Sequence, residues 1–473
     1  MGEKYDIAFL GGGPAGYQGA IRAAQLGARV AVVEEKFVGG VCLNWGCIPT
    51  KAVRASAEVG RSMRRAREYG FKPVETIPDI AAIIGRKQRV VKSLRRSIEQ
   101  LFRARKIELF EGRGALTGPG KIEVQKDGQA DLVEARKVVI ATGSRPAGLP
   151  IFPNSPRIFL ADEMLDISYL PAHLLVVGGG AVGVEMAAIF RELGSEVTLV
   201  EALHHILPHD DREMTDSLLS TLQRREIKIS CGTSVESVAD SGDGFNVRLS
   251  NGTEITPDTI LQAIGRRLNT AGIGLEELGI EMEQGRILVD KHLQTNVAGH
   301  YAAGDVVGDW LLAHVAFAEG ICAAEHALGR QSWMDYWVVP RCVFTIPEYA
   351  AVGISEEEAR KEYSVKVSRF PFKSLGIAQA IGESEGQVKI IADIETDTIL
   401  GAHIVGPHGA DLIAEIALAM RSDLPVRAIM DTIHTHPTLS EAVLEVAQAL
   451  HGQAIHSATS GHAPHQRNNS RMA

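Results

Sequence analysis

The sequence contains one glycine-rich pattern twice, at a constant offset of 167 residues. Each copy reads as a short apolar strand, a glycine-rich turn, an alanine-rich helix and a second strand that ends in glutamate. The equivalent positions are Gly11, Gly13, Gly16 and Glu34 in the first copy, and Gly178, Gly180, Gly183 and Glu201 in the second. A single glycine pattern is weak evidence, but two copies in full strand–turn–helix–strand context predict two dinucleotide sites on parallel sheets.

The chemistry of each copy follows from its residue types. The first glycine permits a tight turn, the second lets the backbone approach a pyrophosphate, and the third allows close packing of helix and strand. The pyrophosphate is expected at the helix N-terminus, where backbone N–H groups and the helix dipole favour anions. Glu34 and Glu201 each suit a free ribose 2′-hydroxyl and repel a 2′-phosphate. With no arginine in the sequence next to Glu201, we expect NAD rather than NADP at the second site.

Two cysteines, Cys42 and Cys47, follow the first copy and precede Pro49 and Thr50, which are typical of a first helical turn. Backbone N–H groups and the helix dipole favour a thiolate at such a position, which indicates a redox pair. Position alone leaves buried apolar cysteines equally open. Half of a metal site is a poorer interpretation, because the other three cysteines are scattered. A redox pair needs a two-electron carrier beside it, and FAD at the first site fits that need.

Composition narrows the functional class. The 473 residues carry a formal net charge of −9 and 45% hydrophobic residues, which gives no reason to expect nucleic acid. The N-terminus lacks the charged-then-apolar pattern of a secretion signal, and no apolar run approaches a membrane span. Five cysteines without a disulfide-framework spacing favour a reducing compartment, so we expect the cytoplasm.

A basic helix is predicted over 86–106, with Val90, Leu94, Ile98 and Leu101 on its apolar face. It contains nine basic residues and one acidic residue. These charges could form a docking face for an acidic partner or an ordinary solvated helix face, and we favour the solvated face.

Near the C-terminus the sequence reads His434-Thr-His436-Pro-Thr-Leu-Ser-Glu441. Residues 438–441 match a helix capping box, and the two histidines could ligate a metal if a third ligand were present. A cysteine redox pair also needs a base held by a carboxylate, and His436 with Glu441 offers one. The residues alone do not decide between capping and catalysis.

These motifs together resemble the flavin-dependent pyridine-nucleotide disulfide oxidoreductases, over nearly the whole chain up to His456. The resemblance implies an α/β fold with two Rossmann-like domains, for FAD and NAD, and an α+β C-terminal dimerisation domain. The double-histidine motif is similar to that of the family members that oxidise protein-bound dihydrolipoyl groups. Such groups belong to 2-oxo acid dehydrogenase or glycine cleavage complexes. Leu268, where the family often has proline, and the His-rich tail are departures.

The resemblance also implies roles for individual residues. Cys42 is the thiol that exchanges with the lipoyl group, Cys47 lies against the flavin, and His436, hydrogen-bonded to Glu441, removes the dihydrolipoyl proton. Lys51, paired with Glu185, is expected beside the flavin ring. Further cofactor-binding positions are expected at Gly114, Gly143, Asp305 and Ala313 for FAD, and at Gly265 for NAD.

The expected organisation has five segments. They are 1–150 and 267–339 for FAD, 151–266 for NAD, 340–456 for the dimer interface, and a disordered tail at 457–473. The base is expected from the partner subunit, so the protein is predicted to be an obligate homodimer. An NADPH-dependent reductase of small disulfides, and a flavoprotein scaffold without turnover, are the alternative functions.

Overall fold

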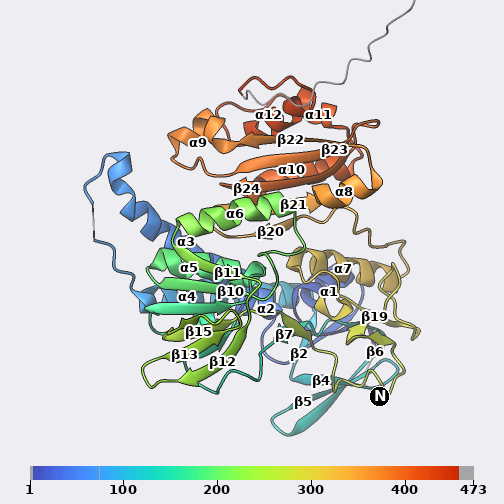
Figure 1. Ribbon diagram of the computed structural model, residues 1–473. Coiled ribbons are helices and arrows are strands. Elements are labelled where there is room, and N and C mark those ends of the chain that lie inside the picture. Colours follow the sequence, from blue (N-terminus) through green and yellow to red (C-terminus); the bar gives the residue numbers. More distant parts are fainter. Residues whose placement is uncertain (1–3, 74, 457–473) are drawn as a thin grey trace, which may run out of the picture. The chain divides into compact units, whose positions relative to one another are not determined.

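The computed structural model describes residues 4–73 and 75–456, which form two compact units (Figure 1). The first unit contains 4–73, 75–178, 189–198 and 234–335, and the second contains 179–188, 199–233 and 336–456. The predicted tail at 457–473 lies outside the described residues. Within the described ranges, no helix is long and apolar enough to cross a bilayer.

A parallel sheet with an antiparallel extension forms the centre of the first unit. Its parallel part has the order β3-β2-β1-β6-β19, and the first half of the long strand β6 continues into the antiparallel pair β5 and β4. The strands are β1 (Tyr5–Leu10), β2 (Val30–Glu34), β3 (Glu108–Glu111), β4 (Arg113–Gly118), β5 (Lys121–Lys126), β6 (Gln129–Ile140) and β19 (His300–Ala302).

Side chains of this sheet alternate between two apolar layers, as the two-residue period of a strand requires. Ile7 and Phe9 pack with helices α1 (Pro14–Gln25), α4 (Ile80–Ala104) and α7 (Ala313–Ala327). Ala8 and Leu10 face the opposite way, toward side chains of β4, β5 and β6. The sheet is therefore covered on both faces, which is typical of a parallel dinucleotide-binding sheet.

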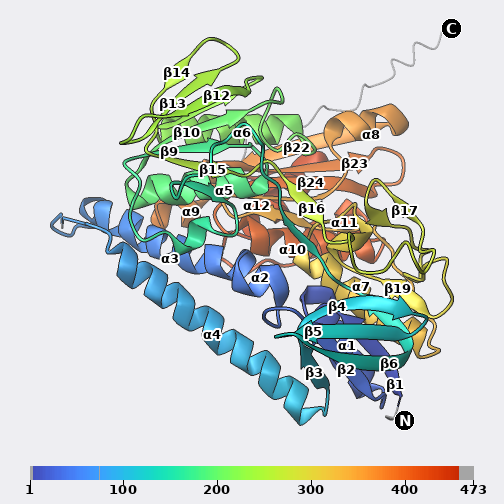
Figure 2. The same cartoon turned by 90° about the horizontal axis from the view of Figure 1, so that it is seen from below.

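Helix α4 is a single long helix that begins at Ile80, before the predicted start at Arg86 (Figure 2). Its buried residues are Lys87, Val91, Ile98 and Phe102, whereas the predicted Leu94 and Leu101 are exposed. Ile98 of the predicted apolar face is therefore confirmed as buried, but that face omitted Val91 and Phe102, and Lys87 was counted as a solvated charge. Lys87 is instead buried, with its ammonium group paired to Asp166.

The remainder of the first unit holds shorter sheets and helices. Strands β8 (Ile158–Leu160), β15 (Thr259–Gln262) and β9 (His173–Val177) run parallel, and β12 (Val235–Asp240), β13 (Phe245–Leu249) and β14 (Glu254–Ile255) are antiparallel. The other elements are α2 (Gly40–Asn44), α3 (Cys47–Arg64), η1 (Ala66–Tyr69), β7 (Ser144–Pro146), η2 (Met164–Asp166), β16 (Arg266–Leu268), β17 (Met282–Glu283), β18 (Arg286–Ile287) and η3 (Asp305–Val307). Helix α5 (Ala181–Leu193) and strand β10 (Glu196–Glu201) contribute residues to both units.

An antiparallel sheet of order β20-β21-β24-β23-β22 forms the centre of the second unit. One face packs against α10 (Gly409–Arg421), α11 (Val426–Asp431) and α12 (Glu441–Leu450), and α6 (Arg212–Arg224) contacts β24. The strands are β20 (Arg341–Val343), β21 (Glu348–Gly353), β22 (Val365–Pro371), β23 (Gln387–Asp393) and β24 (Ile399–Gly406). Shorter elements are β11 (Ile227–Cys231), α8 (Glu356–Glu362), η4 (Phe372–Ser374) and α9 (Gly376–Ala380).

Helices α1 and α7 approach so closely that glycine is required at their contact. A Cβ atom on Gly320 of α7 would lie 2.1 Å from the carbonyl oxygen of Ala15 in α1. We expect Gly320→Ala to destabilise the protein by about 1–3 kcal/mol, since backbone must move to accept the methyl group. The measurement is the thermal unfolding midpoint, which should fall.

Gly60 in α3 supplies the matched control, because its Cβ would meet only the guanidinium of Arg64, at 3.5 Å. Gly60→Ala should raise the midpoint slightly, by reducing the freedom of the unfolded chain by about 0.4–1 kcal/mol. Equal midpoints for the two variants would contradict the packing argument.

Candidate functional site

The two glycine turns have nearly the same local geometry. Gly11 has φ 111° and Gly178 has φ 112°, a region that side-chain-bearing residues rarely adopt. A Cβ on Gly11 would lie 2.2 Å from the carbonyl oxygen of Ala141, and one on Gly178 would lie 2.3 Å from that of Ala263. Each turn is therefore pressed against the end of a neighbouring strand, which leaves the following helix N-terminus open to an anion.

The acidic residues repeat the same hydrogen bonds. In the first copy, Glu34 accepts the N–H of Gly12 at 2.8 Å and that of Lys36 at 2.9 Å. In the second copy, Glu201 accepts the N–H of Gly179 and that of Leu203, the latter at 2.7 Å. All four donors obey the 167-residue offset, so the duplication extends to individual hydrogen bonds.

Burial raises the pKa of Glu34, and the backbone donors around it only partly oppose this. The carboxylate remains next to the glycine turn, where a ribose hydroxyl would bind. Glycine backbone, helix N-terminus and carboxylate thus fit the diphosphate and ribose of a dinucleotide such as FAD.

The predicted FAD-contacting residues all lie in the first unit. Their positions are Gly13 as N-cap of α1, Gly16 within α1, Lys51 in α3, Gly114 in β4, Gly143 between β6 and β7, Asp305 at the start of η3, and Ala313 as the first residue of α7. Asp305 accepts a short hydrogen bond from the hydroxyl of Ser144, which in turn accepts from Arg266 Nε at 2.6 Å. Gly304, just before it, donates its N–H to the buried Glu319 at 2.6 Å.

Three of these supporting residues, Ser144, Arg266 and Glu319, were missed by sequence reasoning. Ser144 follows directly on Gly143, so a hydroxyl beside a strand-end turn was the available signal. Arg266 and Glu319 carry no such signal, because they reach Ser144 and Gly304 only through the tertiary fold.

The predicted NAD-contacting residues are divided between the units. Gly178 and Gly265 lie at strand ends of the first unit, and Gly180, Gly183 and Glu201 belong to the second. Glu185 of α5, which is predicted to pair with Lys51 beside the flavin, also belongs to the second unit, where it accepts the backbone N–H of Phe344 at 2.8 Å.

The structure also brings Arg212 to His205, four residues after Glu201, with 2.9 Å between Nη1 and Nδ1. Its Nε donates to Asp216 at 2.8 Å. Sequence reasoning considered no arginine near Glu201, although Arg212 follows this loop closely in the sequence.

The two cysteines lie on two consecutive helices. Cys42 is in α2 and Cys47 is the first residue of α3, as the Pro49–Thr50 pattern predicts. The N–H groups of Trp45 and Gly46 both donate to the carbonyl of Val41, at 2.8 and 2.7 Å, and this reverses the chain between the two thiols. Both cysteines are present as half-buried thiols.

A hydrogen bond to Cys47 raises the pKa of the Cys42 thiol, and burial raises it further. The charge of Lys51, one helical turn after Cys47, acts in the opposite direction. In the dithiol form, Cys42 therefore keeps its proton more strongly than an isolated cysteine, and the two thiols behave as one coupled pair.

A buried asparagine fixes the cysteine loop. Asn44 donates to the carbonyls of Val38 and Gly40, at 3.1 and 2.9 Å. Its side-chain oxygen accepts from Nε and Nη2 of Arg95 in α4, at 3.0 and 2.7 Å. Arg95, one of the nine basic residues at 86–106, therefore holds the loop between the two cysteines.

In the second unit, His436 and Glu441 lie side by side. His436 Nδ1 is 2.8 Å from Glu441 Oε1, and the other carboxylate oxygen accepts the N–H of Thr438 at 2.9 Å. Burial raises the pKa of Glu441, but the bonds from His436 and Thr438 outweigh it and leave the pKa below its ordinary value. An ionised Glu441 holds a proton on Nδ1 of His436, so Nε2 is the nitrogen that can accept another. The His436 side chain is 79% exposed.

The other elements of this motif have structural positions. His434 is 4% exposed, and its Nε2 lies 2.9 Å from Glu415. Ser440, not Thr438, is the N-cap of α12, and it makes no side-chain cap bond. Of the possible capping box, the bond from the Thr438 N–H to the Glu441 side chain is present, whereas Ser440 takes the N-cap position. In the described part of the chain, no group of three or more His, Cys, Asp or Glu side chains is arranged to hold a metal ion.

The geometry at Glu201 generates a prediction about the dinucleotide. Wild-type protein should prefer NADH to NADPH by at least about tenfold, which corresponds to about 1.4 kcal/mol. Glu201→Gln should narrow this gap, because the repulsion of a 2′-phosphate is lost. The check is a pair of titrations with NADH and NADPH, with Glu196→Gln at the start of the same strand as control. An unchanged ratio in Glu201→Gln would exclude Glu201 from the discrimination.

Comparison with known proteins agrees with this arrangement. Residues 5–320 match the family model described as pyridine nucleotide-disulphide oxidoreductase, and residues 339–447 match the dimerisation domain of the same family. The chain is similar to the dihydrolipoyl dehydrogenase of Thermus scotoductus, with 43% identity over 96% of this chain and 99% of the relative. It is also 40% identical to that of Bacillus subtilis, over 96% of this chain and all of the relative.

Solved structures give the same picture. LpdA from Mycobacterium tuberculosis superimposes with a TM-score of 0.88 and 31% identity, covering 94% of this chain and 99% of the other. The flavoprotein disulfide reductase RclA from Escherichia coli, as a Cu(II) complex, gives 0.86 and 28%, with the same coverage. The predicted fold class, with two dinucleotide-binding domains and a C-terminal dimerisation domain, is confirmed. The chain belongs to the pyridine nucleotide-disulphide oxidoreductase family.

Proposed function

We propose that this protein is a dihydrolipoyl dehydrogenase, which oxidises protein-bound dihydrolipoyl groups with NAD through FAD and the Cys42–Cys47 pair. The observation that carries the proposal is the combination in one chain of a coupled cysteine pair, two equivalent dinucleotide turns and a carboxylate-held histidine. The near full-length similarity to dihydrolipoyl dehydrogenases supports the choice of substrate.

The protein's own residues account for the thiol chemistry. His436 Nε2 takes a proton from one dihydrolipoyl thiol, and the resulting thiolate attacks the sulfur of Cys42 in the Cys42–Cys47 disulfide. The bond between the cysteines breaks and Cys47 leaves as a thiolate. The second lipoyl thiol then displaces Cys42, which yields the lipoyl disulfide and two reduced cysteines. The first glycine turn, Glu34, Lys51 and Asp305 would hold FAD, which would supply two-electron transfer between this dithiol and NAD.

Glu441 maintains the base in this scheme. Its low pKa keeps it ionised at neutral pH, so it orients His436 and stabilises the imidazolium that forms. Asn44 and Arg95 hold the cysteine loop in place during the exchange. The loop therefore needs little rearrangement between its disulfide and dithiol forms.

The dimerisation-domain match supports a homodimer. We propose that His436 serves the cysteines of the other subunit, that the partner is a lipoyl-carrying protein of a 2-oxo acid dehydrogenase or glycine cleavage complex, and that the enzyme is cytoplasmic. We also propose the division into 1–150 and 267–339 for FAD, 151–266 for NAD and 340–456 for the dimer interface.

Turnover of the cysteine variants tests the proposed function. Purified protein loaded with FAD should reduce NAD with dihydrolipoamide, and both Cys42→Ser and Cys47→Ser should abolish this reaction. Cys42→Ser should also show a long-wavelength absorption band without reduction, from a Cys47 thiolate beside the flavin, and Cys47→Ser should lack it. Cys231→Ser is the control, since that residue lies on β11 and has no proposed role.

Preferential NADPH oxidation with small disulfides would instead identify the protein as a small-thiol reductase. Absence of any dithiol–NAD turnover in the wild type would support a scaffold. A band in Cys47→Ser would reverse the assignment of the two cysteines.

Hybrid dimers test the shared site. A hybrid of one Cys42→Ser subunit and one His436→Ala subunit should recover about half of the wild-type activity per dimer. The reason is that one of its two sites combines intact cysteines with an intact base from the other chain. Each parent homodimer should be nearly inactive, because loss of a positioned base typically costs about 10²–10⁴-fold. An inactive hybrid with verified composition and bound FAD would show that each site is built within one chain.

A further inference from the structure

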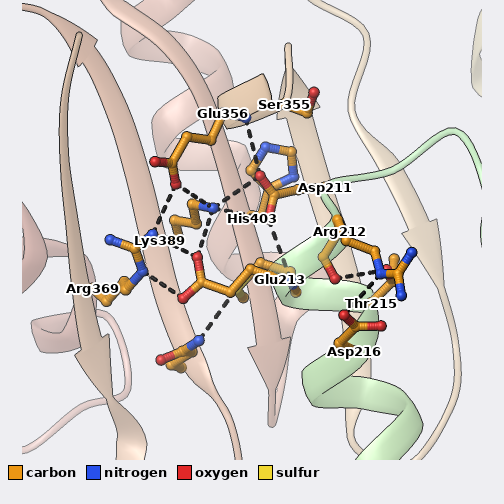
Figure 3. A network of polar contacts seen from close by, with 12 residues as sticks. Asp211, Arg212, Glu213, Thr215, Asp216, Ser355, Glu356, Arg369, Lys389 and His403 are labelled. Atoms are coloured by element: carbon orange, nitrogen blue, oxygen red, sulfur yellow. Dashed lines mark hydrogen bonds and ion pairs between the residues drawn. The ribbon is translucent and has the colours of Figure 1, made fainter. Parts of the chain in front are cut away.

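A row of polar side chains crosses one face of the C-terminal sheet (Figure 3). Lys389 on β23 lies opposite Arg369 on β22 and opposite His403 on β24. Their neighbours Val388 and Ile390 point into the apolar core on the other face. The Lys389 side chain is only 1% exposed, so its ammonium group depends on protein partners for solvation.

Three carboxylates from two other segments surround this ammonium group. Lys389 Nζ lies 2.9 Å from both oxygens of Asp211, and 2.8 Å from Oε2 of Glu213 and from Oε2 of Glu356. Arg369 binds Glu213 and Glu356, at 2.6 and 2.8 Å. The Asp211 side chain is 2% exposed, so this contact is almost completely removed from water.

The charge state of the network follows from the same contacts. Burial lowers the pKa of Lys389, but the three carboxylates outweigh it and leave the pKa above its ordinary value. Burial lowers the pKa of His403 to about 4, so this ring is neutral near pH 7. Arg360 of α8 also binds Glu356, at 2.6 Å, so three cations meet three anions. Removal of Lys389 would leave the three carboxylates with two arginines, and the buried Asp211 would lose its ammonium partner.

Asp211 connects this network to the second dinucleotide turn. Glu201, which accepts the Gly179 N–H, begins a loop at 202–210 that ends at Asp211. In the middle of the loop, the N–H of Leu207 donates to the Gly179 carbonyl at 3.0 Å. At its end, Arg341 of β20 donates to Asp210 at 3.0 Å, and Asp211 accepts the N–H of Glu356 at 3.0 Å.

Asp211 also fixes the direction in which the chain leaves the loop. Its side chain accepts the N–H of Met214 at 3.2 Å and so caps the start of α6. The loop is thus held at one end by the residues expected to bind NAD and at the other by the C-terminal sheet.

We propose that Lys389 and Asp211 are positioning residues for NAD, which preform the 202–210 loop beside the ribose-binding Glu201. The proposal rests on the proposed function, because it needs NAD at the second glycine turn. If the free loop always has the conformation that binds NAD, no affinity for NAD is lost. If it has that conformation for only a tenth of the time, the apparent affinity for NAD falls about tenfold. The maximal rate at saturating NAD stays the same, because the reacting groups are not in the loop.

The experiment is calorimetric titration with NADH of the FAD-loaded dimer, held fully reduced by dithionite so that NADH cannot pass its hydride to the flavin, for wild type and Lys389→Met. Methionine keeps most of the side-chain volume and removes the charge. We expect the NADH dissociation constant to rise about tenfold. The turnover rate at saturating NAD and the KM for dihydrolipoamide should stay within about twofold.

Glu385→Gln is the matched control. Glu385 lies just before β23 and pairs with Arg225, at the far end of α6, at 2.5 Å. It therefore also connects α6 to the C-terminal sheet, without touching the loop. Its loss should leave NADH affinity within about twofold of wild type.

A second substitution provides a rescue. Asp211→Asn in the Lys389→Met background keeps an N-cap side chain and removes the buried carboxylate that has lost Lys389. The NADH dissociation constant of this double variant should be at least about threefold lower than that of Lys389→Met. A purely structural role for Lys389 would instead lower the unfolding midpoint of Lys389→Met and leave its NADH affinity unchanged.

If folded, FAD-containing Lys389→Met binds NADH as tightly as the wild type does, the proposal is overturned. If that variant does not fold, Arg341→Met decides, because it removes the ion pair to Asp210 at the end of the loop, together with a 3.5 Å bond to the Gly353 carbonyl. Unchanged NADH affinity in Arg341→Met also overturns the proposal. If the wild-type protein itself fails to bind NADH, the proposed function fails. A wild type that binds NADH and oxidises dihydrolipoamide, with unaffected variants, refutes only the positioning role.

Discussion

The contact between a glycine turn and the end of the neighbouring strand is the constraint on which both nucleotide sites depend. At Gly11 and Gly178 a carbonyl oxygen occupies the place of a side chain. The turn can therefore reverse within a few residues and start a helix immediately after the strand. The same turn presents the N–H that binds Glu34 or Glu201. One backbone arrangement thus determines where the diphosphate and the ribose of a dinucleotide would lie.

Local features of this protein could be read from its sequence. The strand–turn–helix units, the helix that begins at Cys47, and the ends of β2 and β10 depend on short-range steric and capping rules. The pairing of His436 with Glu441 was suggested by their spacing and by resemblance, and the structure brings the two side chains to 2.8 Å. Their catalytic roles remain predictions.

Long-range polar contacts could not be predicted in the same way. Arg95 looked like one more charge on a basic helix, although it binds Asn44 between the cysteines. Lys87 looked solvated, although it is buried against Asp166. A periodic sequence pattern assigns a long basic side chain to solvent, whereas its apolar stem can lie in the core and its charge can find a partner far along the chain. This accounts for the missed burial of Lys87 on α4.

The buried network around Lys389 differs from the apolar core on the opposite face of its sheet. Apolar side chains such as Val388 and Ile390 stabilise the sheet without selecting one precise arrangement of the segment that packs on it. A buried lysine with three carboxylates contributes little net stability, because desolvation of the charges offsets most of their attraction. The network favours one position of Asp211, since a displacement would separate its buried carboxylate from the ammonium group of Lys389. A loop beside the Glu201–Gly179 hydrogen bond is therefore held in one position more precisely by such a charged contact than by a larger apolar contact.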